Sequence, residues 1–300
     1  MPLGTQCWVL LTRAPSQQQQ LASQHPLPAV AVLASGSPSI ELSQAPLVLG
    51  GLPSTKEEMV DTELPPAKQH WYERYVLPCL AELLGSALFV FLGCLSVVED
   101  TNDSGRMQPA LVHGLAVVPI AVALGNISGA HINPVVSLGL WLVGAMKLIM
   151  LIPYCIAQLC GGILGAALTK AVAHSGNYAN TTGGAFSIIR TNGQIGAALG
   201  NEIILTTSLM LVICMTVVNG ETKSHLAPVC IALTVTINII AGGGISGPCM
   251  NPARAFGPAV IANYWDYHWV YWVGPLIACV ISSLLMRFVI GDRAIRLFLK

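Results

Sequence analysis

The sequence predicts an all-α membrane protein built from an inverted internal repeat. Three observations lead there: scarce charge, long apolar runs and two matched short motifs. The 300-residue chain has 14 basic and 14 acidic residues, 9 % of the total, whereas soluble domains carry about 25 %. Its hydrophobic fraction is 54 % and its mean hydropathy is +0.66. This composition disfavours a soluble enzyme, a nucleic-acid-binding protein and a disordered hub, and zero net charge gives no attraction to polyanions.

The first 70 residues differ from the rest. They contain 9 of the 19 prolines and the run Gln17–Gln20, and no helical or strand period persists in them. We expect residues 1–70 to be a disordered N-terminal extension, followed by a membrane domain over 71–300. The apolar stretch Cys7–Leu11 is too short for a signal peptide, and no basic residue precedes it.

Six apolar runs in the membrane domain have the length of membrane-spanning helices. A bilayer core of about 30 Å needs about 20 helical residues. Because lipid solvates no backbone polar group, such runs must be helices or a closed barrel, and their lack of alternation favours helices. We expect helices at about 76–98, 110–125, 148–172, 195–218, 226–242 and 268–290.

The basic residues predict that both termini are cytoplasmic, because ten of the fourteen then fall on the inner side. These ten are Arg13, Lys56, Lys68, Arg74, Lys147, Lys223, Arg287, Arg293, Arg296 and Lys300. In this orientation the sequons at Asn102 and Asn180 face outward as possible glycosylation sites. The nine cysteines show no CxxC pair and no zinc-type spacing with histidine, so we interpret them as small core residues.

Two apolar segments, 128–139 and 246–257, are too short to span. They share Ser, Gly, Asn, Pro and a final Gly at a constant offset of 118 residues, and Glu82 and Glu202 recur at an offset of 120. The chain therefore repeats three helices plus one short segment, with repeat one at 76–172 and repeat two at 195–290. Since three is odd, the second copy must enter the membrane from the opposite face, which places a transport site near the midplane.

An Asn-Pro dipeptide explains each short segment. Asparagine is a favoured N-cap and proline suits the first helical position, so Asn133–Pro134 and Asn251–Pro252 should each begin a half-helix. The two positive N-termini would then meet at the membrane centre, and the preceding loop carbonyls would line a wet path. A single copy would read as an ordinary turn, but two matched copies favour a narrow pore for neutral, hydrogen-bonding solutes.

The repeat and the boxes Asn133-Pro-Val135 and Asn251-Pro-Ala253 resemble the aquaporin (major intrinsic protein) family over about residues 71–300. Further matching stretches are 71–75, 82–87, 93–97 and 249–260. The resemblance implies six transmembrane helices plus two re-entrant half-helices, with one pore per subunit. It also implies a homotetramer in lipid, with water and small neutral solutes as partners and no nucleic acid. The membrane implied is the plasma membrane, with intracellular membranes as the alternative.

The resemblance further implies a filter on the outer side, formed by His113, Ile239, Pro248 and Arg254. An arginine in an apolar span is costly unless it lines water, and a structural arginine paired with glutamate is the alternative. His113 and Ile239 would otherwise be ordinary core residues. With His and Ile at these positions, the filter resembles the wider kind that admits ammonia and hydrogen peroxide as well as water.

Buried Glu82 and Glu202 could support the re-entrant loops or relay protons, and the repeat favours support. Two residues depart from the family pattern. Val135 replaces the usual alanine and adds two methyl groups where the half-helices should touch, at a cost of about 1–3 kcal/mol unless repacking absorbs them. Pro248 stands where relatives have glycine and stiffens the loop. Cys249 beside it is interpreted as a thiol at the pore mouth.

A passive channel is therefore the function that the sequence favours. A glycerol facilitator would usually carry Asp directly after the filter arginine, where this chain has Ala255. A secondary active transporter would need intramembrane carboxylates for ion coupling, and only Glu82 and Glu202 qualify. No metal-ligand cluster or nucleophile–base set indicates an enzyme, and no cofactor is expected.

Overall fold

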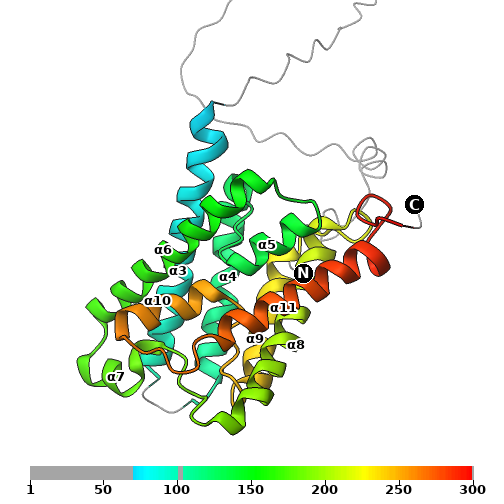
Figure 1. Cartoon of the computed structure of the whole chain (residues 1–300). Coiled ribbons are helices and arrows are strands. Elements are labelled where there is room, and N and C mark those ends of the chain that lie inside the picture. The colour runs from blue at the N-terminus through cyan, green and yellow to red at the C-terminus, as the bar shows by residue number, and fades with distance from the viewer. Residues whose placement is uncertain (1–69, 101–103, 299–300) are drawn as a thin grey trace, which may run out of the picture. The chain divides into compact units, whose positions relative to one another are not determined.

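The computed structural model describes residues 70–100 and 104–298, and the regular structure in this part is helical (Figure 1). Except for His70, the expected extension at 1–70 lies outside the described residues, as does the sequon residue Asn102. Asn180, the second sequon residue, is exposed at the end of a short helix.

The two predicted repeats appear as two similar series of helices. In the first, η1 (Tyr72–Val76) leads into α3 (Leu77–Val98), followed by α4 (Met107–Ser128), α5 (Pro134–Leu142) and α6 (Leu148–Val172). In the second, α8 (Ile195–Ile213) and η4 (Cys214–Val218) are followed by α9 (Ala227–Gly242), α10 (Pro252–Ala262), α11 (Val270–Leu285) and η5 (Met286–Ile290). The connection between them carries α7 (Ser175–Asn180), η2 (Thr182–Gly184) and η3 (Asn192–Gln194).

Five of the six expected spans are long and apolar enough to cross a membrane by length and composition. They are Tyr72–Val98, Met107–Ser128, Leu148–Val172, Asn192–Val218 and Val270–Ile290. The sixth, α9, is apolar but has only 16 residues, which at 1.5 Å per residue gives about 24 Å. It ends where the glycines 242–244 begin, and the chain turns there into the second re-entrant loop.

Close backbone contacts hold the short helices inside the bundle. A side chain on Gly257 of α10 would collide with the backbone of Gly162 in α6, and one on Gly162 would collide with the carbonyl of Ala253. Small residues at both positions let α10 pack directly on α6, the arrangement by which membrane helices associate without a hydrophobic driving force. The half-helix is therefore fixed against a full-length helix.

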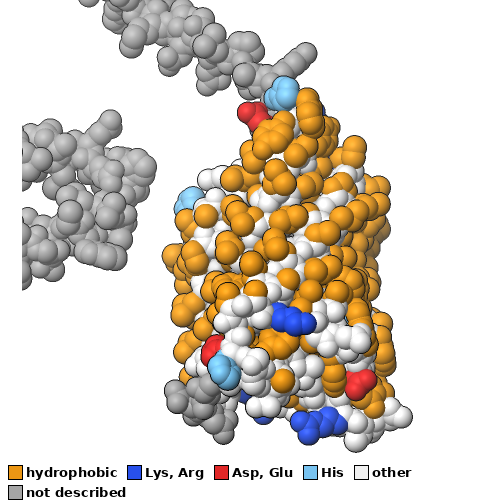
Figure 2. Space-filling view, turned by 90° about the vertical axis from the view of Figure 1, so that its left-hand side faces the viewer, with side chains coloured by type: hydrophobic (Ala, Val, Ile, Leu, Met, Phe, Trp, Pro, Cys, Tyr) orange, Lys and Arg blue, Asp and Glu red, His pale blue; other side chains and the backbone are white. Residues whose placement is uncertain are grey.

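The outer surface of the bundle is apolar. In Figure 2 hydrophobic side chains cover the middle of the face, and the charged side chains it shows lie toward its ends. Exposed residues include Leu80, Leu84 and Leu88 of α3 and Ile152 and Ile156 of α6. Soluble monomers rarely expose such continuous apolar area, so this surface fits contact with lipid.

Candidate functional site

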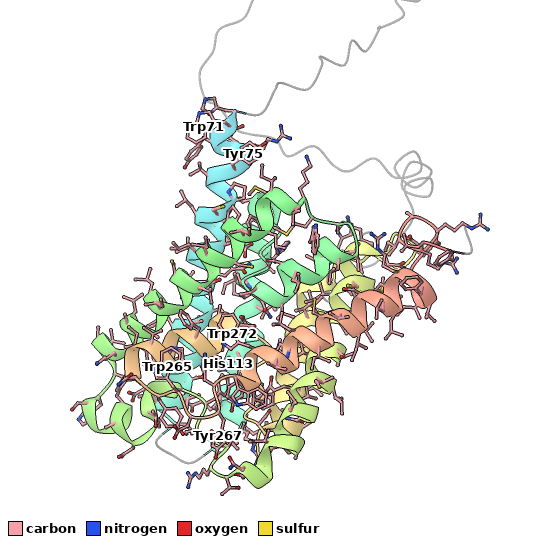
Figure 3. All side chains as sticks on the ribbon, viewed as in Figure 1. Trp71, Tyr75, His113, Trp265, Tyr267 and Trp272 are labelled. Atoms are coloured by element: carbon pink, nitrogen blue, oxygen red, sulfur yellow. The ribbon has the colours of Figure 1, made fainter. Side chains whose placement is uncertain are left out.

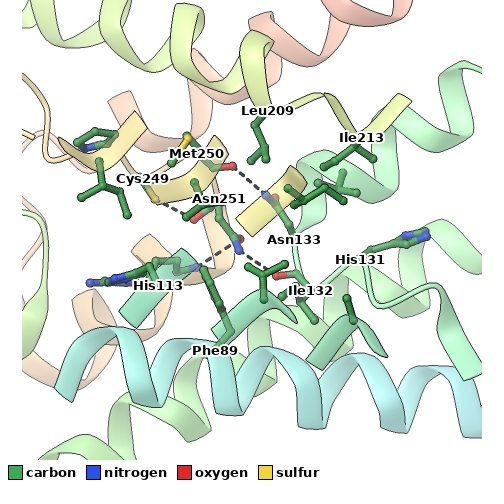
Figure 4. A pocket seen from close by; sticks show the side chains of 18 of the residues that line it. Phe89, His113, His131, Ile132, Asn133, Leu209, Ile213, Cys249, Met250 and Asn251 are labelled. Carbon is green, nitrogen blue, oxygen red and sulfur yellow. Dashed lines mark hydrogen bonds between the residues drawn. The ribbon is translucent and has the colours of Figure 1, made fainter. Parts of the chain in front are cut away.

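The two re-entrant loops meet through their capping asparagines. The side-chain oxygen of Asn133 accepts the N–H of Val135 at 3.0 Å, and that of Asn251 accepts the N–H of Ala253 at 3.0 Å. Each amide nitrogen reaches across to the other loop: Asn133 Nδ2 donates to the carbonyl of Met250 at 2.8 Å, and Asn251 Nδ2 to that of Ile132 at 2.9 Å (Figure 4). The N-termini of α5 and α10 therefore face one another, with their amide donors fixed.

The carboxylate of Glu82 organises the first loop. It is fully buried and accepts the hydroxyl of Ser128 at 2.6 Å and the backbone N–H groups of His131 at 2.9 Å and Ile132 at 2.6 Å. Gln158 of α6 donates to the same carboxylate at 2.8 Å. A buried carboxylate is stabilised by such donors, and here they hold the backbone just before the asparagine cap.

Glu202 does the same for the second loop. It accepts the Ser246 hydroxyl at 2.6 Å and the N–H groups of Cys249 at 2.9 Å and Met250 at 3.0 Å. Met250 has φ of 54° and its counterpart Ile132 has φ of 44°, a left-handed conformation that non-glycine residues rarely adopt. The carboxylate bonds and the asparagine bonds together fix this strained backbone.

Sequence reasoning missed three polar residues that complete this support. Tyr154 donates its hydroxyl to the carbonyl of Ser128 at 2.9 Å, and Tyr271 donates to the carbonyl of Ser246 at 2.7 Å. The two tyrosines recur at an offset of 117 residues, a signal that a longer comparison of the repeats would have found. Gln158 has no such counterpart, because Pro275 stands 117 residues later.

Arg254, three residues after the second capping asparagine, is joined to His113. Arg254 Nε donates to His113 Nε2 at 3.0 Å, and Arg254 Nη1 donates to the carbonyl of Gly184 at 2.9 Å. The guanidinium also lies 4.7 Å from the ring centroid of Phe186. His113 Nδ1 lies 2.7 Å from the carbonyl of Pro109, so a neutral imidazole with its proton on Nδ1 satisfies both neighbours. In the described part of the chain, Arg254 thus bonds a histidine and a backbone carbonyl rather than a glutamate.

A cavity of about 980 Å³ lies along the two caps and the Arg254–His113 pair. His113, Ile239, Pro248 and Arg254 all line it, and so do both capping asparagines. Apolar residues such as Leu209 and Ile213 also line the cavity. Among the described residues, the charged side chains that line it are Arg106, Lys223 and Arg254. The four residues expected at a filter therefore border one continuous space with the two caps.

The remaining expected site residues lie behind or beside this space. Val135 is 1 % exposed and Ala253 is fully buried. The bond from the asparagine side chain to the N–H two residues later is 3.0 Å long in both loops, so the two extra methyl groups of Val135 fit without displacing the cap. Pro134 and Pro252 are the buried first residues of α5 and α10. Cys249 borders the cavity but is 5 % exposed, and its thiol donates to the carbonyl of Asn251 at 2.9 Å.

Comparison with known proteins gives consistent matches. Residues 72–286 match the family described as Major intrinsic protein. Proteins named Aquaporin-8 from Notomys alexis and Rattus norvegicus are 56 % and 55 % identical over 230 residues, which is 77 % of this chain and 88 % of each relative. The X-ray structure of the aquaglyceroporin from Plasmodium falciparum superposes with a TM-score of 0.64 at 26 % identity, covering 72 % of this chain and 97 % of that one. The fold class predicted from the sequence is confirmed.

Proposed function

The chain belongs to the major intrinsic protein family, and from this premise we propose that it is a passive channel for water and small neutral solutes. Membership places it among integral, multi-pass membrane channels rather than enzymes. The observation that carries the proposal is the single cavity that passes His113 and Arg254, then the two opposed asparagine caps. Amide donors and loop carbonyls along such a path replace the hydrogen bonds that a neutral solute gives up when it leaves bulk water.

The solutes proposed are water, ammonia and hydrogen peroxide. His113 accepts the Arg254 N–H and presents a neutral imidazole, and Ile239, which also lines the cavity, offers only an apolar side chain. This combination leaves few polar groups at the filter and suits small solutes that need only one or two hydrogen bonds. A glycerol facilitator is the second candidate, because the similar structure is named an aquaglyceroporin. The neutral Ala255 after Arg254 speaks against it.

Protons and cations are excluded by fixed positive potential. The N-termini of α5 and α10 point at the same place, and each contributes a partial positive charge. Arg254 adds a full charge at the filter. A coupled transporter is disfavoured because the carboxylates of Glu82 and Glu202 are occupied by loop donors and do not border the cavity.

Assembly and orientation are part of the same proposal. A homotetramer in the plasma membrane agrees with the apolar surface (Figure 2). Both termini in the cytoplasm agree with the ten basic residues that the sequence assigns to the inner side. Asn180 would then be exposed on the outside, where it can be glycosylated. Removal of a glycan from Asn180 by external glycosidase on intact cells tests the orientation. The chain has a third sequon, Asn126-Ile-Ser128, which faces the inner side in this orientation, so a glycan at Asn126 would reverse it.

Stopped-flow measurements on proteoliposomes test the function. We expect the wild-type protein to raise fluxes of water, ammonia and peroxide above those of empty vesicles, with little glycerol flux and no need for an ion gradient. Arg254→Ala and His113→Ala should change the relative fluxes, whereas Arg190→Ala, an exposed arginine away from the cavity, should not. If the flux ratios of the solutes stayed unchanged in both Arg254→Ala and His113→Ala, the filter assignment would be wrong. If flux required an ion gradient, the protein would not be a passive channel.

A further inference from the structure

A buried polar side chain on α9 contacts the second re-entrant loop. Asn238 is 5 % exposed, and its Nδ2 donates to the carbonyl of Leu205 at 2.9 Å and to the sulfur of Met250 at 3.2 Å. Met250 borders the cavity next to the two capping asparagines (Figure 4). Sulfur is a weak acceptor, so an amide directed at it in an apolar span is an unusual choice of partner.

In the first repeat, the corresponding loop residue is surrounded by different side chains. The offset of 118 residues that relates Asn133 to Asn251 also relates Ile132 to Met250 and Ile120 to Asn238. Ile120 and Ile132 lie in one apolar core cluster, and both approach the position that a side chain on Gly85 would occupy. The first loop residue thus lies among branched apolar side chains, whereas in the second repeat an amide is bonded to the thioether of the loop residue.

The side chains of the two loop residues, Ile132 and Met250, differ in stiffness. Isoleucine is branched at Cβ and restricted at χ1, whereas methionine is unbranched and has three rotatable side-chain bonds. The backbone of Met250 is already fixed, because its N–H is bonded to Glu202 and its carbonyl to Asn133. Only its side chain remains free to turn into the adjacent space, at the point where the two half-helices meet.

We propose that Asn238 is a positioning residue that holds the Met250 thioether against α9 and so keeps the centre of the pore open. The proposal rests on the proposed water channel. The bond to Leu205 keeps the Asn238 amide oriented, and the bond to sulfur selects one conformation of Met250. The first repeat needs no such residue because Ile132 has no flexible end.

Water flux through substituted channels tests this role. Asn238→Leu keeps the side-chain size and removes the donor. We expect its water flux per assembled channel to fall about two- to tenfold, the range over which one neutral hydrogen bond shifts a conformational equilibrium. The double variant Asn238→Ile with Met250→Ile rebuilds the pair of the first repeat and should restore the flux. Thr234→Val removes another hydrogen-bond donor of α9, the hydroxyl bonded to the carbonyl of Cys230 at 2.8 Å, at a position that does not border the cavity; it serves as the control and should conduct as the wild type does.

Oxidation of Met250 gives a second readout that a purely structural role would not move. Hydrogen peroxide transfers one oxygen atom to the thioether to give the sulfoxide and leaves as water. When peroxide is added to the reconstituted channel, mass spectrometry should find Met250 oxidised faster in Asn238→Leu than in the wild type. Fully buried Met210, which does not border the cavity, is the internal reference.

The outcomes are distinguishable. Failure of the wild-type protein to conduct water overturns the proposed function, while the oxidation measurement still tests the position of Met250. Wild-type conduction with unchanged Met250 oxidation in Asn238→Leu overturns the positioning role. A loss of flux in Asn238→Leu that the double variant does not restore also overturns it, because the defect would then lie elsewhere in the bundle.

Discussion

The first re-entrant loop (128–133) and the second (246–251) share a scaffold and differ in what they present to the pore. In each, a buried glutamate accepts a serine hydroxyl and two backbone N–H groups, and a tyrosine donates to the serine carbonyl. The asparagine-to-carbonyl distances across the centre, 2.8 and 2.9 Å, are nearly equal. The shared bonds are those that set the geometry of the crossing point.

The residues around the caps differ. Three positions after Asn133 stands Val136, whereas the corresponding residue after Asn251 is Arg254, and His131 and Ala130 correspond to Cys249 and Pro248. The proposed filter therefore takes its loop residues, Pro248 and Arg254, from the second repeat alone. Because inversion places the loops on opposite faces, one copy can acquire a charge without altering the support that both copies need.

Loss of either glutamate should have the largest effect, because it removes the part that both loops share. Glutamine in place of Glu82 or Glu202 turns one acceptor into a donor that faces backbone N–H groups, and each buried donor left unpaired costs about 1–3 kcal/mol. We expect both variants to unfold at lower temperature in detergent. Glu82→Gln should be the more severe, since Glu82 also accepts from Gln158.

Exposed Glu221 provides the matched control for that experiment, and Glu221→Gln should unfold with the wild type. Thermal unfolding followed by loss of the monodisperse peak in gel filtration is a suitable measurement. Equal stability of all three variants would contradict the support role of the carboxylates.

Arg254→Val copies the side chain of the first loop into the second and should have the next largest effect, on selectivity rather than on stability. At an effective dielectric constant of about 20, a unit charge about 8 Å away contributes roughly 2 kcal/mol, or about a 30-fold change in cation entry. We expect a measurable methylammonium or potassium conductance in this variant. Arg190→Val removes an arginine that does not border the cavity and should remain closed to cations; equal conductance in both would remove Arg254 from the filter.

The sequence could predict the features that both loops share, but not the contacts that differ between them. The caps, the glutamates and the repeat boundaries follow from spacing along the chain, so residues such as Asn133 and Glu202 could be identified without a structure. His113 was grouped with Arg254 only through the family resemblance. The hydrogen bonds of Arg254 could not be predicted, since His113 lies 141 residues away and the Gly184 carbonyl belongs to an irregular connection. Asn238 was missed for the same reason, because its contact with Met250 depends on how α9 packs.

Val135 shows a second limit of prediction from the sequence, which concerns packing. Its two extra methyl groups suggested crowding between the half-helices, but crowding depends on the space left by neighbouring helices. The cap distance at Asn133 equals that at Asn251, and the Val135 carbonyl accepts the thiol of Cys279 at 3.5 Å. A sequence records the size of a side chain and not the size of the site that receives it.

Exchanging the two box residues would show how far each site is adapted to its side chain. Val135→Ala should lower the free energy of unfolding by about 1–2 kcal/mol, because a buried site loses two methyl groups. Ala253→Val should destabilise by about 1–3 kcal/mol through overpacking, since the Ala253 backbone lies directly against Gly162. Denaturant titration in mild detergent would compare the two, and a stabilising effect of either would contradict this account of the packing.

The connections that leave the half-helices differ as well. Residues 143–147 after α5 contain no aromatic side chain. After α10, Trp265, His268 and Trp272 form a cluster with Phe256 of that helix. Their rings lie 6.0–6.4 Å from the Phe256 ring, and Trp265 and His268 are 5.0 Å apart; Figure 3 shows Trp265 and Trp272 beside α10 and α11. His268 Nε2 accepts the indole N–H of Trp272 at 2.9 Å. The connection after α10 thus contains a histidine inside an aromatic cluster, and the connection after α5 has no such cluster.

This histidine should give the smallest of the expected effects, a pH dependence of stability. Burial lowers the pKa of His268 below its ordinary value of 6.5. Above pH 6.5 the imidazole is neutral in both the folded and the unfolded chain. As the pH falls below 6.5, the unfolded chain binds a proton at His268 that the folded chain does not bind. The free energy of unfolding therefore decreases until the pH reaches the pKa of the folded state. Between about pH 7 and pH 5 the wild type should therefore lose more stability than His268→Gln, whose side-chain oxygen can still accept the Trp272 N–H. Thermal unfolding of the two proteins at both pH values isolates His268 from the other histidines, because these contribute equally to both. Parallel losses would show that the aromatic cluster tolerates a protonated His268, and the two connections would then not differ in their response to pH.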